Sequence, residues 1–259
     1  MHKHVWIALA LGAASLTTGT LALNGRPDIS PDRAAPPKAM SAAVAQLPVV
    51  VEFFTSQGCS SCPPSDRLAA RLAREPGVVV IQRPVTYWDR LGWRDTLASP
   101  ANTALQQAYS RKGLAGRNGV YTPQAVVAGR SGLVGSQETA LRQRIAEARK
   151  LGGPEIRFQA KHDGSLEIMI DKAGAQRAQV LLVGLDREET VQVSRGENGG
   201  RSLAYTNIWK GERVLGTLAG GTARYMIDAA DRTIAGANRY AVVVREHAAG
   251  PVLAGRMLP

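Results

Sequence analysis

Two cysteines, Cys59 and Cys62, are the residues whose type and spacing most directly indicate chemistry. They are the only cysteines of the chain, so they form no disulfide scaffold, and their spacing is that of the Cys-x-x-Cys pairs that carry out thiol–disulfide exchange. A structural disulfide clip and a thiol pair for Cu(I) or Zn are the alternatives. The chain has only four histidines, which argues against a Cys-His nucleophile and a histidine-rich metal site. We expect no cofactor and no metal site.

The segments around the cysteines predict a strand, a turn and a helix. Residues 49–54 are β-branched and aromatic, as in a buried strand, and Gly58 allows a sharp turn before Cys59. Apolar residues at helical spacing follow from Asp66, and Pro63-Pro64 fit only near the start of that helix. A helix N-terminus stabilises a thiolate, so we expect Cys59 to be an exposed nucleophile and Cys62 to resolve the mixed disulfide.

The rest of the first half predicts alternating strands and helices. We expect a strand at 78–81, a helix at 101–112, a strand at 125–129 and a helix at 136–150. This order matches the thioredoxin succession, so residues 49–152 are predicted to form an α/β thioredoxin-like domain. In that fold the X-Pro bond beside the cysteines is cis, and Thr122-Pro123 holds the matching place. Thr122 and Pro123 are therefore candidate substrate-binding residues.

Several long motifs resemble one family. They are 51–66, which carries the cysteines, 87–93, 120–124 and the Gly-rich 196–201. Together they are similar to the secreted bacterial proteins of the family named domain of unknown function 1223. The resemblance implies a thioredoxin-like fold and no settled activity.

Two further features near the cysteines suggest roles in the same chemistry. Tyr87 and Trp88 belong to an aromatic segment that either forms a wall of a substrate groove or anchors its own loop to the protein. Glu52 stands in the apolar strand before the cysteines, where a buried carboxyl is able to take the proton of the resolving thiol. The alternatives for Glu52 are an outward orientation or a pair with an arginine.

The second half predicts only strands. Gly152-Gly153-Pro154 marks a boundary, and residues 153–259 are expected to form an all-β sandwich-like domain. The expected strands are 155–159, 165–171, 179–185, 190–195, 204–209, 214–218, 222–227 and 240–245. Neither a nucleophile–base pair nor metal-ligand spacing occurs there, and we interpret 196–201 as a β-turn, not a phosphate-binding loop.

The N-terminus predicts export. Residues 1–22 have the charged start, apolar run and small-residue cleavage site of a signal peptide, and the Pro/Ala-rich residues 23–48 are expected to be a linker. We therefore expect a periplasmic or extracellular protein with no stable membrane span after cleavage. The net charge is +11, but the basic residues are dispersed along the chain, so nucleic acid is not an expected partner. The expected partners are thiols or disulfides of other exported proteins, and the sequence indicates no oligomeric state.

Overall fold

A computed structural model describes residues 47–114, 119–174, 177–247 and 249–259. The predicted signal peptide and nearly all of the predicted linker lie outside these residues. In chain order the elements are β1 (Val49–Thr55), α1 (Pro63–Leu72), β2 (Val78–Pro84), the 3-10 helix η1 (Asp89–Leu91), α2 (Pro100–Arg111), β3 (Gln124–Val127), β4 (Ser131–Val134), α3 (Glu138–Lys150), β5 (Glu155–Ala160), β6 (Leu166–Ala173), β7 (Ala178–Gln192), β8 (Ser202–Leu218), β9 (Gly221–Ile227), β10 (Arg239–Arg245) and β11 (Val252–Met257).

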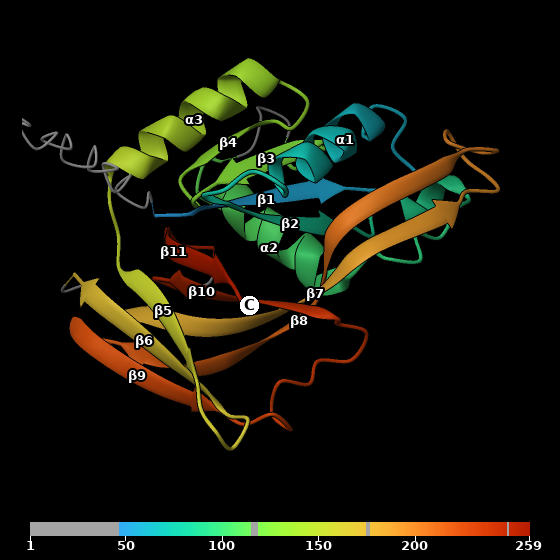
Figure 1. The fold of residues 1–259 in the computed structure, drawn as a ribbon. Helices are drawn as coiled ribbons and strands as arrows, with labels where there is room; N and C mark the ends of the chain where they lie inside the picture. The colour runs from blue at the N-terminus through green and yellow to red at the C-terminus, as the bar shows by residue number, and fades with distance from the viewer. Residues whose placement is uncertain (1–46, 115–118, 175–176, 248) are drawn as a thin grey trace, which may run out of the picture. The chain divides into compact units, whose positions relative to one another are not determined.

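One eight-stranded mixed sheet runs through both halves of the chain (Figure 1). Its strand order is β11-β10-β7-β8-β2-β1-β3-β4, and β5-β6-β9 form a second, three-stranded sheet. The junction is a parallel contact between β2 and β8, where Gln82 stands opposite Ile208. The predicted fold class, an α/β thioredoxin-like domain followed by an all-β sandwich-like domain, is therefore wrong. The described residues are mostly strand, and strands of the second half extend the sheet of the first.

Two long strands cause this difference from the sequence prediction. β7 and β8 each join two segments that the sequence separates, and they pair with each other over most of their length. The charged run Asp186–Glu189 interrupts the apolar pattern but not the strand. The pairing of β7 with β8 shifts register at Val180/Leu181 and at Gly184/Leu185. Such irregularities are typical of β-bulges, which bend a strand. One pair of strands thereby reaches both β10 and β2.

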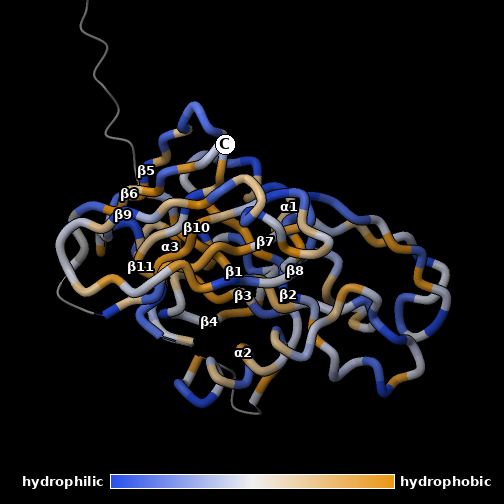
Figure 2. The backbone as a smooth tube through the Cα atoms, turned by 90° about the horizontal axis from the view of Figure 1, so that it is seen from below, coloured by the Kyte–Doolittle hydropathy of each residue, from blue (hydrophilic) through white to orange (hydrophobic). Residues whose placement is uncertain are grey.

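The helices cover both faces of β1 and its neighbours. Val51 and Phe53 of β1 pack with residues of α1 and α3, whereas Phe54 points to the opposite face and packs with Tyr109 of α2. Alternate residues of a strand point to opposite faces, so Val50 and Glu52 share the face of Phe54. Figure 2 shows that the apolar parts of the chain concentrate on the central strands.

The second half adds two further apolar clusters. The small sheet packs on the large one through an apolar cluster that contains Ile168 and Ile170 together with Leu182 and Val242. Val50 of β1 belongs to a cluster that also contains residues of β7, β10 and β11, so the two halves share one core. Among the described residues, no helix combines the length and the apolar character that crossing a membrane requires.

Candidate functional site

Cys59 and Cys62 form a disulfide immediately before α1. Their Cα atoms are 5.4 Å apart, Cys62 is the N-cap residue, and Pro63 is the first residue of the helix. The sequence prediction of a turn followed by a proline-started helix is thus confirmed. Both cysteines are 0% exposed, although Ser60 and Ser61 between them are exposed. The expectation of an exposed Cys59 is wrong for this state of the protein.

The loop that follows β2 holds the turn before Cys59. The backbone N–H of Gln57 donates to Asp95 Oδ2 at 2.8 Å, and Gln57 Oε1 accepts a hydrogen bond from Trp93 Nε1 at 2.8 Å. Gln57 Nε2 donates to Thr96 Oγ1 at 3.1 Å. Gln57 is fully buried, so these bonds satisfy the polar groups that the turn would otherwise leave without partners.

The tip of the β7–β8 hairpin covers the same turn. Asn198 Nδ2 donates to the carbonyl oxygens of Gln57 and Cys59, each at 2.9 Å, and its Oδ1 accepts from Arg201 at 2.8 Å. Glu197 Oε2 accepts the backbone N–H of Ser60 at 3.0 Å. The Gly-rich segment read from the sequence as a plain turn therefore forms part of the disulfide site. Only its resemblance to a family motif pointed to it.

Thr122-Pro123 is cis, as the sequence predicted. Trp88 Nε1 donates to Thr122 Oγ1 at 2.8 Å, and the Cβ of Trp88 lies against Gly58, beside Cys59. On its other side the carbonyl oxygen of Pro123 accepts from the backbone N–H of Gly135 at 3.0 Å. Gly135 in turn leaves no room for a side chain next to Ser65 in the first turn of α1.

Tyr87 and Trp88 are partly buried in a cluster with Phe54, Tyr109 and Val126. Burial raises the pKa of Tyr87 to about 12. These contacts favour the interpretation that the aromatic segment anchors its own loop. The loop brings Trp88 next to Gly58, whereas the role of Tyr87, Trp88, Thr122 and Pro123 in binding a substrate stays a prediction.

Glu52 does not have the properties of a proton acceptor. Its carboxylate lies between Arg83 Nε at 2.6 Å and Arg245 Nη2 at 2.8 Å, and accepts from the Tyr109 hydroxyl at 2.5 Å. Burial raises its pKa, but the charges of Arg245 and Arg83 and the Tyr109 hydrogen bond outweigh burial and lower the pKa to about 2. Glu52 is thus paired with arginines on the face of β1 opposite α1, which is the alternative that the sequence left open. This pairing disfavours a catalytic role for Glu52, and that role stays a prediction.

Asp66 is a buried acid on the cysteine side that the sequence analysis passed over. It lies one turn after Cys62, with its backbone N–H bonded to the Cys62 carbonyl at 3.1 Å, and Gln82 Nε2 donates to its Oδ1 at 2.8 Å. Burial, with a further contribution from the charge of Asp95, raises the pKa of Asp66 to about 7. The sequence does carry a signal for Asp66, because it stands four residues after Cys62 at the start of a helix. Residues four apart lie on the same face of a helix.

Asp66 should make the protein less stable as the pH rises towards neutrality. Its pKa in the folded state is above its ordinary value of 3.8, so folding favours the protonated form. That contribution is complete below about pH 4 and is lost as the pH rises through 7, at about 1 kcal/mol per pH unit between pH 5 and 7. We expect the free energy of unfolding in urea to fall between pH 5 and pH 8 in the unaltered protein, and Asp66→Asn to remove this fall. Asp228→Asn, at an exposed acid, is the control and should leave it unchanged.

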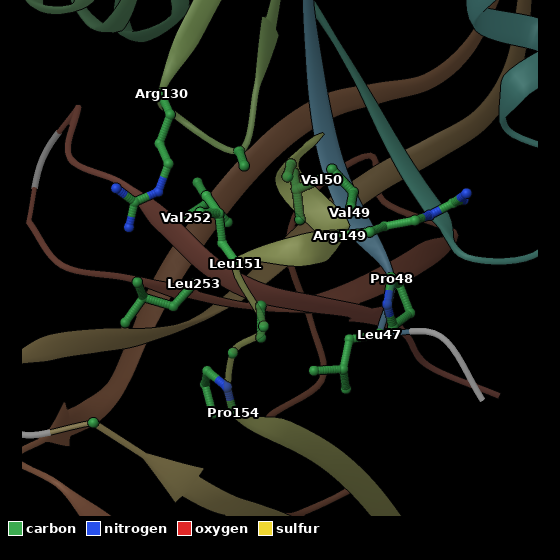
Figure 3. A pocket seen from close by; sticks show the side chains of 16 residues that line it. Leu47, Pro48, Val49, Val50, Arg130, Arg149, Leu151, Pro154, Val252 and Leu253 are labelled. Carbon is green, nitrogen blue, oxygen red and sulfur yellow. The ribbon is translucent and has the colours of Figure 1, made fainter. Parts of the chain in front are cut away.

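The described residues contain pockets but no cluster of metal ligands. No group of three or more His, Cys, Asp or Glu side chains capable of holding a metal ion occurs within the described ranges. A pocket of about 300 Å³ lies at the junction of β1, α3 and β11, where Val50, Leu151 and Val252 converge (Figure 3). None of the candidate site residues lines it.

Comparison with known proteins places the chain in a family. The chain is similar to a solved structure of protein AGR_C_4864 from Agrobacterium tumefaciens, at 31% sequence identity and a TM-score of 0.70. The similarity covers 81% of this chain and 93% of that one. HBP35 of Porphyromonas gingivalis is similar in fold alone, at 15% identity and a TM-score of 0.54, over 82% of this chain and 75% of that one.

None of the curated proteins matches the chain. A family model described as a protein of unknown function, DUF1223, matches residues 50–245, which include the disulfide, the cis proline and the hairpin tip. The chain therefore belongs to the DUF1223 family.

Proposed function

We propose that this protein carries out thiol–disulfide exchange with other exported proteins through Cys59 and Cys62. The observation that carries the proposal is the disulfide at the N-terminus of α1, with Cys62 as the N-cap residue. Unpaired N–H groups and the helix dipole at this position stabilise a thiolate, which is both the attacking and the leaving species in exchange. Export, which the N-terminal sequence predicts, would place the protein where disulfides persist.

The exchange is a two-electron transfer between two dithiol–disulfide pairs. A client thiolate attacks Cys59 Sγ, the Cys59–Cys62 bond breaks, and Cys62 leaves as a thiolate. A second client thiolate then attacks the client sulfur of the mixed disulfide and releases Cys59 as a thiolate. The client is oxidised to a disulfide, Cys59 and Cys62 are reduced, and two protons are redistributed.

Asp66 is the group of this site that is suited to move a proton. A thiolate left at buried Cys62 is costly, and protonation removes that cost. Because Asp66 is one helical turn from Cys62 and has a pKa of about 7, it is partly protonated at neutral pH. In this proposal Asp66 gives its proton to Cys62 when the disulfide opens, and takes one back when the disulfide re-forms.

A structural role for the disulfide is the second candidate function, and burial favours it. Both cysteines are covered, and the hairpin tip bonds to the backbone of Cys59 and Ser60. Exchange therefore requires the tip to move away from the turn. In a non-enzymatic binding module the same contacts would hold the disulfide permanently closed.

Trapping of mixed disulfides separates the two functions. We expect Cys62→Ser to form mixed disulfides with a model disulfide-bonded protein, because Cys59 attacks and no second thiol releases the product. Cys59→Ser is the matched control and should form none. The adducts are counted on non-reducing gels and by intact mass.

The redox potential gives an independent reading of the same choice. Equilibration with glutathione should place the Cys59–Cys62 couple among the oxidoreductases, roughly −120 to −270 mV. A couple below about −300 mV, together with no adduct from Cys62→Ser, would establish the structural disulfide instead.

A further inference from the structure

A pocket remote from the disulfide collects three arginines. It has a volume of about 440 Å³, within the range of small-molecule sites, and Arg187, Arg232 and Arg239 line it. They come from separate segments: Arg187 from β7, Arg232 from the β9–β10 connection, and Arg239 from the first position of β10. None of the candidate site residues discussed above belongs to this pocket.

Neutral groups, not carboxylates, hold the arginines in place. Arg239 Nη1 donates to Asn207 Oδ1 at 3.0 Å, and Arg232 Nη2 donates to the carbonyl of Gly164 at 2.9 Å. Across the described ranges, none of the three guanidinium groups forms an ion pair with a carboxylate. The guanidinium groups of Arg232 and Arg239 are therefore held by neutral acceptors.

Two nearby acids already have other partners. Asp186 pairs with Lys210 at 3.5 Å and accepts a hydrogen bond from Asn238 Nδ2 at 2.8 Å. Asp231, next to Arg232 in sequence, pairs with Arg213 at 3.5 Å. Partial burial and the charge of Arg187 lower the pKa of Arg239, and the opposing charge of Glu188 does not outweigh them. A lowered pKa is the effect expected when like charges share a site. An anion in the pocket would relieve this repulsion.

Much of the remaining lining is apolar or aromatic. Tyr240, Leu258, Ala229 and Pro259 line the pocket together with the polar Asn238, and Tyr240 and Leu258 are only partly exposed. Guanidinium groups bind carboxylate and phosphate oxygens in pairs, and the apolar surface suits a carbon skeleton next to the charged group.

We propose that this pocket is a binding site for a small organic oxyanion, a carboxylate or phosphate attached to an apolar body. The ligand's charged oxygens face Arg187, Arg232 and Arg239, and its carbon skeleton lies on Tyr240 and Leu258. The site is independent of the thiol–disulfide chemistry, because no residue is shared between the two.

Binding of simple probes to the intact protein tests the site. Calorimetry with inorganic phosphate, phenyl phosphate and benzoate is run against sodium chloride of matched ionic strength. We expect saturable binding of all three probes, with phenyl phosphate at least tenfold tighter than inorganic phosphate. Binding no stronger than that of chloride would overturn the site, and equal affinity for phosphate and phenyl phosphate would overturn the apolar half of the proposal.

Variants show whether the arginines are responsible. Arg187→Gln and Arg232→Gln should each weaken phenyl phosphate at least tenfold, and the double variant should bind none that is measurable. Arg144→Gln removes an equal charge from an exposed position of α3 that does not line the pocket, and should bind normally. Arg232 lies outside the strands, so its variant tests the site without disturbing the sheet. Equal weakening in Arg144→Gln would assign the binding to overall charge and contradict the proposal.

Discussion

Replacing Glu52 with Ala is expected to lower the free energy of unfolding by about 3–5 kcal/mol. The carboxylate is 1% exposed and is the anion between Arg83 and Arg245, which are themselves 2% and 3% exposed. Without it, two guanidinium groups remain buried together, and Tyr109 loses its acceptor. A buried charge that loses its partner costs far more than the pair contributed, because water cannot reach it.

Urea unfolding of the full chain with an intact disulfide measures this loss. Glu75→Ala is the matched control: Glu75 pairs with Arg142 at 2.8 Å, but both side chains are well exposed. Exposed pairs contribute about 0–1 kcal/mol, so the control should unfold close to the unaltered protein. A Glu52→Ala loss no larger than that of Glu75→Ala would contradict the buried cluster.

The same cluster predicts acid sensitivity with a defined window. The pKa of Glu52 is about 2 in the folded protein against an ordinary 4.5, so folding favours its ionised form. Its contribution to stability is complete above about pH 4.5 and is lost as the pH falls through 2. The unaltered protein should show this loss between these values, and Glu52→Gln should lack it.

Replacing Asn198 with Ala is expected to speed reduction of the Cys59–Cys62 disulfide about thirtyfold. Asn198 is fully buried, and its amide donates two hydrogen bonds of 2.9 Å to the backbone on either side of Gly58. Two such bonds together stabilise the closed state by about 2 kcal/mol, and a factor of ten in an equilibrium is about 1.4 kcal/mol. If reduction proceeds from an opened tip, the rate rises with the population of that state.

Pseudo-first-order reduction by dithiothreitol, followed by mass after alkylation, measures the rate. Gln192→Ala serves as the control, because Gln192 is an exposed residue of the same hairpin whose Oε1 accepts a hydrogen bond from Ser202 Oγ at 2.8 Å. It should be reduced at the rate of the unaltered protein. Equal rates in all three proteins would show that the tip does not restrict access to the sulfurs.

Short-range features of the site follow from the sequence because they depend on a few neighbouring residues. The apolar run of β1, the turn at Gly58 and the two prolines that open α1 each carry their own local signal. The Cys-x-x-Cys spacing brings the sulfurs together wherever the chain turns into a helix, and Thr122-Pro123 was identified from its position between helix and strand. The family was identified from its long sequence motifs and not from arguments about folding.

Long-range contacts decided the parts that the sequence left open or gave wrongly. Glu52 is paired by Arg83 of β2 and by Arg245, which is 193 positions away in the chain. Asn198, 139 positions from Cys59, closes over it. An apolar pattern shows that a strand is buried, but it does not specify which strand lies beside it, and the bulged β7–β8 pair joined two predicted domains into one sheet.

The sequence by itself therefore determined the cysteine pair, its local frame and the family, because propensity, turn residues and motif spacing act over short stretches. Only the tertiary structure decided that Glu52 is a fixed ion and Asp66 the titratable acid, since both pKa values depend on burial and on charges brought from other parts of the chain. It also decided that the disulfide is covered, because the covering residues belong to a hairpin whose position depends on the whole sheet.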